Sequence, residues 1–180
     1  MKRVFFALLS LALAMSMVSG CGKGPSKPAD QYFDEGAALM KQGKQKEALA
    51  AVEDGLKAAP DSPRGWFYKG NVLFSMGRKE EAVAAYDKVI ELDPHNAQPY
   101  YNKGTALAGL GRDEEAVDAF TRATQMDPKH AKAYNNMALV LGKLGRNDEA
   151  RTAFARAEEL DPSLKAPAVD AAGANVIKVK

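Results

Sequence analysis

The chain has 180 residues and a formal net charge of +2 at pH 7. Lys2 and Arg3 lie in the first 20 residues, which hold no acidic residue, so the rest of the chain carries a formal charge of zero. This balance, without a lysine or arginine cluster on one face, excludes a nucleic-acid-binding surface. Cys21 is the only cysteine, which excludes an internal disulfide.

Residues 1–20 have the pattern of a secretory signal. Lys2 and Arg3 are followed by an almost unbroken apolar stretch from Val4 to Met17, which is too short to span a membrane. The sequence from Val18 to Cys21 resembles the bacterial lipoprotein box, in which the cysteine thiol takes diacylglycerol and becomes the new N-terminus. This resemblance implies lipidation at Cys21, with a palmitate-type acyl chain, and anchoring to a membrane surface.

Residues 21–28 are rich in glycine and proline, and we interpret them as a flexible tether between the lipid and the folded part. The lipoprotein signal places the protein in a bacterial cell envelope, on the periplasmic side. Sorting in enteric bacteria reads the residue after the cysteine, and Gly22, which is not an aspartate, favours the outer membrane over the inner membrane.

Beyond the tether, prolines recur with a period of 34 residues, at Pro60, Pro94, Pro128 and Pro162. A fixed period of this length, without catalytic residues, is typical of a solenoid of stacked repeats. When the proline takes the thirty-second place, the chain divides into four repeats: 29–62, 63–96, 97–130 and 131–164.

Small residues recur at three places of the repeat. The eighth place holds Gly36, Gly70, Gly104 and Ala138, the fifteenth Gly43, Gly77, Gly111 and Gly145, and the twentieth Ala48, Ala82, Ala116 and Ala150. Small side chains at the eighth and twentieth places allow two helices to approach closely. Glycine at the fifteenth place enters the left-handed conformation that ends a helix, so each repeat is predicted to be a helix–turn–helix unit.

Large apolar residues recur at places that face inward. The fourth place holds Tyr32, Trp66, Tyr100 and Tyr134, the eleventh Leu39, Leu73, Leu107 and Leu141, and the twenty-fourth Val52, Tyr86, Phe120 and Phe154. The fourth and eleventh places are seven residues apart and share one face of the first helix. We expect these residues to form the core rather than a cofactor pocket.

These columns resemble the tetratricopeptide repeat (TPR) over residues 29–164. The resemblance implies an all-α fold, a right-handed α-solenoid of about four helix-turn-helix repeats. Repeat 1 departs from the pattern at Gly55, where repeats 3 and 4 have Ala123 and Ala157, and we expect it to be the least stable unit because a glycine inside a helix is unfavourable. In repeat 4, Arg151 and Glu158 replace apolar residues of earlier copies and are expected to be exposed.

Residues 165–180 form a C-terminal tail that contains Pro167 and Gly173. We expect it to be partly disordered or to contain a short capping helix near residues 166–173. Its last residues alternate between apolar and polar, so pairing as a strand with a partner is the second interpretation.

In TPR arrays the second, fifth, ninth and twelfth places of the first helices line the concave face. Here these places are aromatic or polar and only lightly charged, which suits an extended peptide or an amphipathic helix. The predicted peptide-binding groove consists of Phe67, Asn71, Tyr101, Asn102, Thr105, Lys132, Asn135 and Asn136. Packing between first helices is the alternative role for Phe33 and Phe67, and we expect the asparagines to serve binding rather than stability.

Some TPR proteins bind a C-terminal carboxylate with a set of lysine, arginine and asparagine side chains. The corresponding residues here are Phe67, Asn71, Asn102, Lys132 and Asn136. Three of them match, but two cations are missing, and a buried carboxylate needs those charges. Recognition of main-chain or side-chain groups is therefore the better prediction.

No catalytic residue, metal ligand or cofactor site is predicted. His95 and His130 lie at repeat junctions without a nucleophile nearby, and we expect both to be exposed loop residues. The acidic residues at the start of each second helix suit the helix dipole and are expected to be solvated.

The sequence therefore predicts a membrane-anchored adaptor without enzymatic activity, whose groove binds a segment of another envelope protein. Assembly of an envelope machine, such as a pilus secretin or the outer-membrane assembly apparatus, is consistent with this layout. The alternative is a structural spacer or self-associating scaffold, a homo-oligomer whose groove is filled by its own tail or a second copy.

Overall fold

A computed structural model describes residues 27–164. The predicted signal, Cys21, most of the tether and the tail after residue 164 lie outside the described residues. The described part contains eight helices and no strand: α1 (Ala29–Lys41), α2 (Gln45–Ala58), α3 (Pro63–Ser75), α4 (Lys79–Leu92), α5 (Ala97–Ala108), α6 (Asp113–Met126), α7 (Ala131–Lys143) and α8 (Asn147–Leu160). None of these helices is long and apolar enough to cross a membrane.

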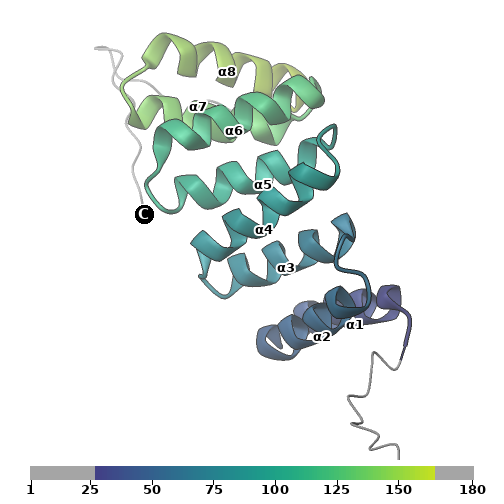
Figure 1. The fold of residues 1–180 in the computed structure, drawn as a ribbon. Coiled ribbons are helices and arrows are strands. Elements are labelled where there is room, and N and C mark those ends of the chain that lie inside the picture. Colours follow the sequence, from purple (N-terminus) through teal and green to yellow (C-terminus); the bar gives the residue numbers. More distant parts are fainter. Residues whose placement is uncertain (1–26, 165–180) are drawn as a thin grey trace, which may run out of the picture.

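The helices stack in chain order into an elongated array (Figure 1). Each helix packs against its neighbours in the chain, and the first helices of successive pairs, α1, α3, α5 and α7, also contact one another. This arrangement confirms the predicted all-α repeat solenoid. Each of the four 34-residue windows contains one helix pair.

A glycine turn connects the two helices of every pair. The turn glycines Gly43, Gly77, Gly111 and Gly145 have φ between 74° and 76°, and no other described residue has a positive φ. A residue with a Cβ is strained in this left-handed conformation, which explains why glycine recurs at the fifteenth place.

Within the second and third pairs, a glycine on the first helix lies directly against an aromatic ring on the second. A Cβ added to Gly70 would lie 2.5 Å from Cε1 of Tyr86, and one added to Gly104 would lie 2.8 Å from Cδ1 of Phe120. Tyr86 is 1% exposed and Phe120 is fully buried. The absence of a side chain at the eighth place therefore allows the ring to fill the space between the helices.

Gly55 in the first pair also lies directly against an aromatic ring. A Cβ on Gly55 would lie 2.5 Å from Cε1 of Phe33, and one on Gly65 of the next repeat would lie 2.6 Å from its Cζ. Phe33 is 1% exposed and belongs to a small core with Val52 and Leu56. Gly55 thus makes room for a buried ring, and Phe33 is a packing residue rather than part of the groove.

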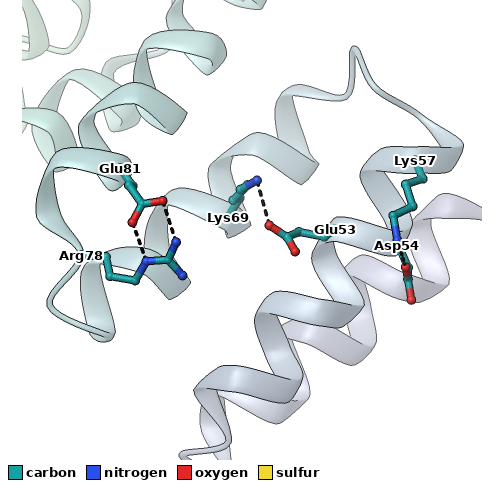
Figure 2. A network of polar contacts seen from close by, with 6 residues as sticks. All are labelled: Glu53, Asp54, Lys57, Lys69, Arg78 and Glu81. Carbon is teal, nitrogen blue, oxygen red and sulfur yellow. Dashed lines mark hydrogen bonds and ion pairs between the residues drawn. The ribbon is translucent and has the colours of Figure 1, made fainter.

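Ion pairs mark the start of the later second helices. Arg78, which precedes α4, donates to both carboxylate oxygens of Glu81 at 2.5 and 2.6 Å (Figure 2). These hydrogen bonds hold the pKa of the Glu81 carboxyl below its ordinary value. Equivalent pairs precede α6 and α8, from Arg112 to Glu115 and from Arg146 to Glu149.

The charged residues of the last two repeats differ in their exposure. Arg151 and Glu158 on α8 are exposed, as predicted. Asp113, at the start of α6, was expected to be solvated but is only 8% exposed. Its Oδ2 atom lies 2.6 Å from Nζ of Lys143 on α7, so this carboxylate joins the third repeat to the fourth.

The contact between Gly70 and Tyr86 predicts that Gly70→Ala lowers the free energy of unfolding. The added methyl group would displace a buried ring, at a cost of about 1–3 kcal/mol, and the better helix propensity of alanine offsets only part of that cost. Urea unfolding followed by circular dichroism measures the difference.

Gly109→Ala is the matched control. There the three atoms nearest to the added Cβ all belong to the side chain of Lys79, whose Nζ atom would lie 2.9 Å away and donates to the Gly109 carbonyl at 2.7 Å. This exposed side chain can move aside, so the variant should change the free energy of unfolding by no more than about 0.5 kcal/mol. Equal effects of the two substitutions would contradict close packing at Gly70.

Candidate functional site

A cavity of about 380 Å³ lies where α1, α3, α4 and α5 meet. It is lined by Met40, Asn71, Phe74, Ser75, Tyr86, Tyr101, Asn102 and Thr105. Four of the eight predicted groove residues, Asn71, Tyr101, Asn102 and Thr105, are among them. The cavity combines apolar walls with convergent polar groups, which is the usual character of a binding site.

A network of hydrogen bonds orders the amides on the floor of the cavity. Oδ1 of Asn71 accepts from the Tyr86 hydroxyl at 2.9 Å and from Nδ2 of Asn102 at 2.9 Å. Oδ1 of Asn102 in turn accepts from Nε2 of Gln98 at 2.9 Å. The network connects two repeats and fixes the orientation of both asparagines.

Tyr86 connects this network to the core. Its side chain is buried, and burial raises the pKa of its hydroxyl above the ordinary value, so the group stays protonated and donates to Asn71. The ring of Phe67 lies 6.2 Å from that of Tyr86, tilted by 54°. Phe67 therefore supports Tyr86 and does not line the cavity.

The fourth repeat contacts the groove through Tyr101. The Tyr101 hydroxyl accepts from Nδ2 of Asn136 at 3.3 Å, and Oδ1 of Asn136 accepts from Nδ2 of Asn135 at 3.4 Å. The hydroxyl of Thr105 donates to the main-chain carbonyl of Tyr101 at 3.0 Å. The predicted residues on α7 thus meet those on α5 through side-chain contacts, although they lie outside the cavity lining.

The prediction that His130 is an exposed loop residue is wrong, because its side chain is half-buried beside Tyr101. Its ring centroid lies 4.7 Å from that of Tyr101, and its Nδ1 atom accepts from the main-chain N–H of Ala133 at 3.2 Å. Ser62 and Asn96 accept main-chain N–H groups at the same place in earlier repeats. Serine and asparagine are common N-cap residues, so their presence at this place in the earlier repeats could have indicated the same role for His130. His95 is exposed, as expected.

Charges in the groove are mostly paired at its N-terminal end. Arg64 on α3 binds Asp30 at 2.9 Å and also Asp34, both on α1. Lys132 is exposed on α7 and has no ion pair with any residue of the described range. Among residues 27–164 there is no group of three or more His, Cys, Asp or Glu residues that would hold a metal ion.

The hydrogen-bonding pattern leaves donors free in the cavity. Both hydrogen bonds of Asn71 use its oxygen, and its Nδ2 atom has no partner among the described residues. The Tyr101 hydroxyl accepts from Asn136, so its own hydrogen remains available. The site therefore offers N–H and O–H donors beside the apolar side chains of Met40 and Phe74.

Comparisons with known proteins agree with this geometry. Two family models match the chain, one described as TPR repeat over residues 70–111 and one as tetratricopeptide repeat over residues 101–165. The structure of MamA AMB-1 is 30% identical, with 74% of this chain and 73% of that chain covered and a TM-score of 0.66. The chain belongs to the tetratricopeptide repeat family. This TPR protein is, at the level the family establishes, a scaffold for protein–protein interaction, and such scaffolds are generally not enzymes.

Two further structures are similar to this TPR chain. MamA from Desulfovibrio magneticus RS-1 is 24% identical with a TM-score of 0.70, and 74% of this chain and 76% of that chain are covered. YrrB, described as a TPR protein with an unusual peptide-binding site, is 25% identical with a TM-score of 0.66, covering 74% of this chain and 69% of that chain. No curated protein sequence matches the chain.

The network around Asn71 predicts a coupling between Asn71 and Tyr86. Asn71→Ala leaves a buried hydroxyl without an acceptor, which should lower the free energy of unfolding by about 1–3 kcal/mol. In the Tyr86→Phe background the same substitution should cost clearly less, because no hydroxyl remains to be satisfied. A double-mutant cycle by urea unfolding measures this coupling.

Equal costs of Asn71→Ala in both backgrounds would contradict the network.

The expectation that the groove asparagines serve binding alone is corrected for Asn71, because its side-chain oxygen accepts a hydrogen bond from the buried Tyr86 hydroxyl. Asn135 has no such contact with a buried group and provides the comparison.

Proposed function

We propose that this TPR protein is a lipid-anchored adaptor of a bacterial envelope, whose concave groove holds an extended or helical segment of another envelope protein. The observation that carries this proposal is the cavity of about 380 Å³ with ordered amides and free donors. The similarity to YrrB, a TPR protein with a peptide-binding site, supports the same use of the fold.

The chemistry of the groove defines the segment. The free N–H groups of Asn71 and the Tyr101 hydroxyl suit main-chain carbonyl oxygens, while Met40 and Phe74 suit an aliphatic side chain. A terminal carboxylate is a poor ligand because the Asp30–Arg64 pair is satisfied within the protein. The bound segment should therefore be uncharged where it crosses the cavity.

The anchor rests on the sequence. Cys21 follows a signal that resembles the lipoprotein box, and the acyl chains of such a lipoprotein bind a bilayer surface strongly. In this proposal the lipid holds the repeats on the periplasmic side, with the outer membrane favoured by Gly22. Assembly of a pilus secretin or of outer-membrane proteins is the kind of process such an adaptor serves.

Photo-crosslinking tests the groove. A photo-reactive residue in place of Ser75, which lines the cavity, should capture one specific envelope protein in living cells. The same residue in place of Arg151, on the exposed side of α8, is the position control and should not capture it. Capture of nothing, or only of a second copy of the chain, would contradict the adaptor function.

The donor role of Asn71 provides a second arm of that experiment. Asn71→Asp keeps the oxygen that accepts from Tyr86 but removes the N–H donor, so capture from Ser75 should fall at least about tenfold, as expected for loss of one well-placed hydrogen bond to a buried partner. Asn147→Asp, at an exposed position at the start of α8, is the matched control. Unchanged capture in Asn71→Asp would show that the donor does not contact the partner.

Fatty-acid labelling tests the anchor. Cys21→Ser should abolish incorporation of labelled palmitate and release the protein from the membrane fraction, because a serine hydroxyl does not form the thioether. Ser26→Ala, in the tether, should keep both properties. Labelling that persists in Cys21→Ser would show that the lipid is attached elsewhere.

A further inference from the structure

A second and larger cavity lies on the other side of the array. It has a volume of about 470 Å³ and is formed by α6, α7 and α8. Tyr134, Met137 and Leu141 from α7 line it together with Val117 of α6 and Ala153 of α8. We refer to it as the α6–α8 pocket.

The pocket is separate from the peptide groove. Its residues on α7 occupy the fourth, seventh and eleventh places of the repeat, while the groove uses the second, fifth, ninth and twelfth. At 100° per residue these two sets are centred roughly 150° apart around the helix. Binding in the pocket therefore does not obstruct the groove, and the two activities can be tested independently.

At the two earlier junctions between repeats, an ion pair connects the second helix of one repeat to the first helix of the next. Lys69 on α3 lies 3.0 Å from Glu53 on α2, as Figure 2 shows. One repeat later, Lys103 on α5 lies 2.5 Å from Asp87 on α4. Both lysines are at the seventh place and both acids at the twenty-fifth place of the preceding repeat, so this contact belongs to the repeating design.

The last junction lacks this ion pair. Met137 stands at the seventh place and Thr121 at the twenty-fifth, with a weak contact of 3.5 Å between the threonine hydroxyl and the methionine sulfur. The equivalent cavity one repeat earlier, which Lys103 lines, has a volume of only about 220 Å³. Replacement of the ion pair thus coincides with a larger and more apolar pocket at the end of the array.

One end of the pocket lies close to the point where the described chain stops. Arg156 lines the pocket and is four residues before the end of α8 at Leu160, about 6 Å along the helix. Its guanidinium binds Glu159 at 2.6 Å on the protein surface. An exposed pair of this kind is weak, and a guanidinium has donors for a second carboxylate.

We propose that residues 165–173 of the same chain bind in the α6–α8 pocket, with Val169 between Tyr134 and Met137 and Asp170 beside Arg156. The segment supplies an apolar side chain next to a carboxylate, which matches the apolar side chains of the pocket and Arg156 at its edge. The acidic residue of the lining, Glu149, is already paired with Arg146. Six Cα–Cα steps lead from Leu164 to Asp170 and span up to about 20 Å, which is enough to reach Arg156.

Because residues 165–173 are covalently attached to α8, even a pocket that is open to solvent can bind them. A free peptide with one valine and one carboxylate would bind weakly, but a short linker gives the segment an effective concentration in the millimolar range. The bound segment would cover the apolar floor that the ion pair covers in the earlier junctions.

Hydrogen–deuterium exchange of the full chain tests this proposal. The variant Thr121→Asp with Met137→Lys installs the ion pair of the earlier junctions and fills the pocket. Amide exchange in residues 165–173 should become about fivefold faster than in the unmodified chain, because a tethered segment occupies a submillimolar site most of the time. Exchange within α7 and α8 should stay slow, which shows that the repeat remains folded.

Two further variants complete the test. Val169→Lys with Asp170→Lys leaves the pocket intact and should accelerate exchange in the segment to the same extent. Asp87→Thr with Lys103→Met alters the preceding junction and should leave exchange in residues 165–173 unchanged. Exchange that is equally fast in the unmodified chain and in the filled-pocket variant would overturn the proposal, as would protection that disappears on dilution, which would indicate a segment from a second copy.

Discussion

The close approach of paired helices, made possible where a glycine faces an aromatic ring, is the constraint on which the rest of the structure depends. Gly70 lets the ring of Tyr86 lie directly against α3. Because the ring is held there, its hydroxyl reaches the side chain of Asn71, the residue that follows Gly70 on α3. Core packing and groove geometry are therefore parts of one contact, and a change in the first is expected to disturb the second.

The groove and the opposite pocket show how a repeated framework acquires individual sites. Each junction uses the same places of the repeat, but the residues at those places differ. Asn71 and Asn102 make a polar connection between the second and third repeats, whereas Tyr101 and Asn136 connect the third and fourth. On the other face, Met137 breaks a series of ion pairs. The individual contacts at each junction thus come from departures from the repeat as well as from the repeat itself.

The sequence predicted the fold well because its signals recur. Glycine turns, small residues between helices and inward aromatic residues each appear in several copies, so one ambiguous position did not change the interpretation. It was less informative where contacts cross between repeats. The burial of Phe33 depends on Gly55 and Gly65, and neither glycine could be related to that ring from spacing alone. The stacking of His130 on Tyr101 was missed for the same reason.

The central claim is that tight helix packing orders the amides of the groove. The side-chain amide signals of asparagine in a nuclear magnetic resonance spectrum of the Gly70→Ala variant test it most directly. We predict that the signals of Asn71 and Asn102 shift together while that of Asn135, a repeat further along, stays in place. Unchanged signals for Asn71 and Asn102 in a folded variant would contradict the claim, because the groove would then be ordered independently of the core.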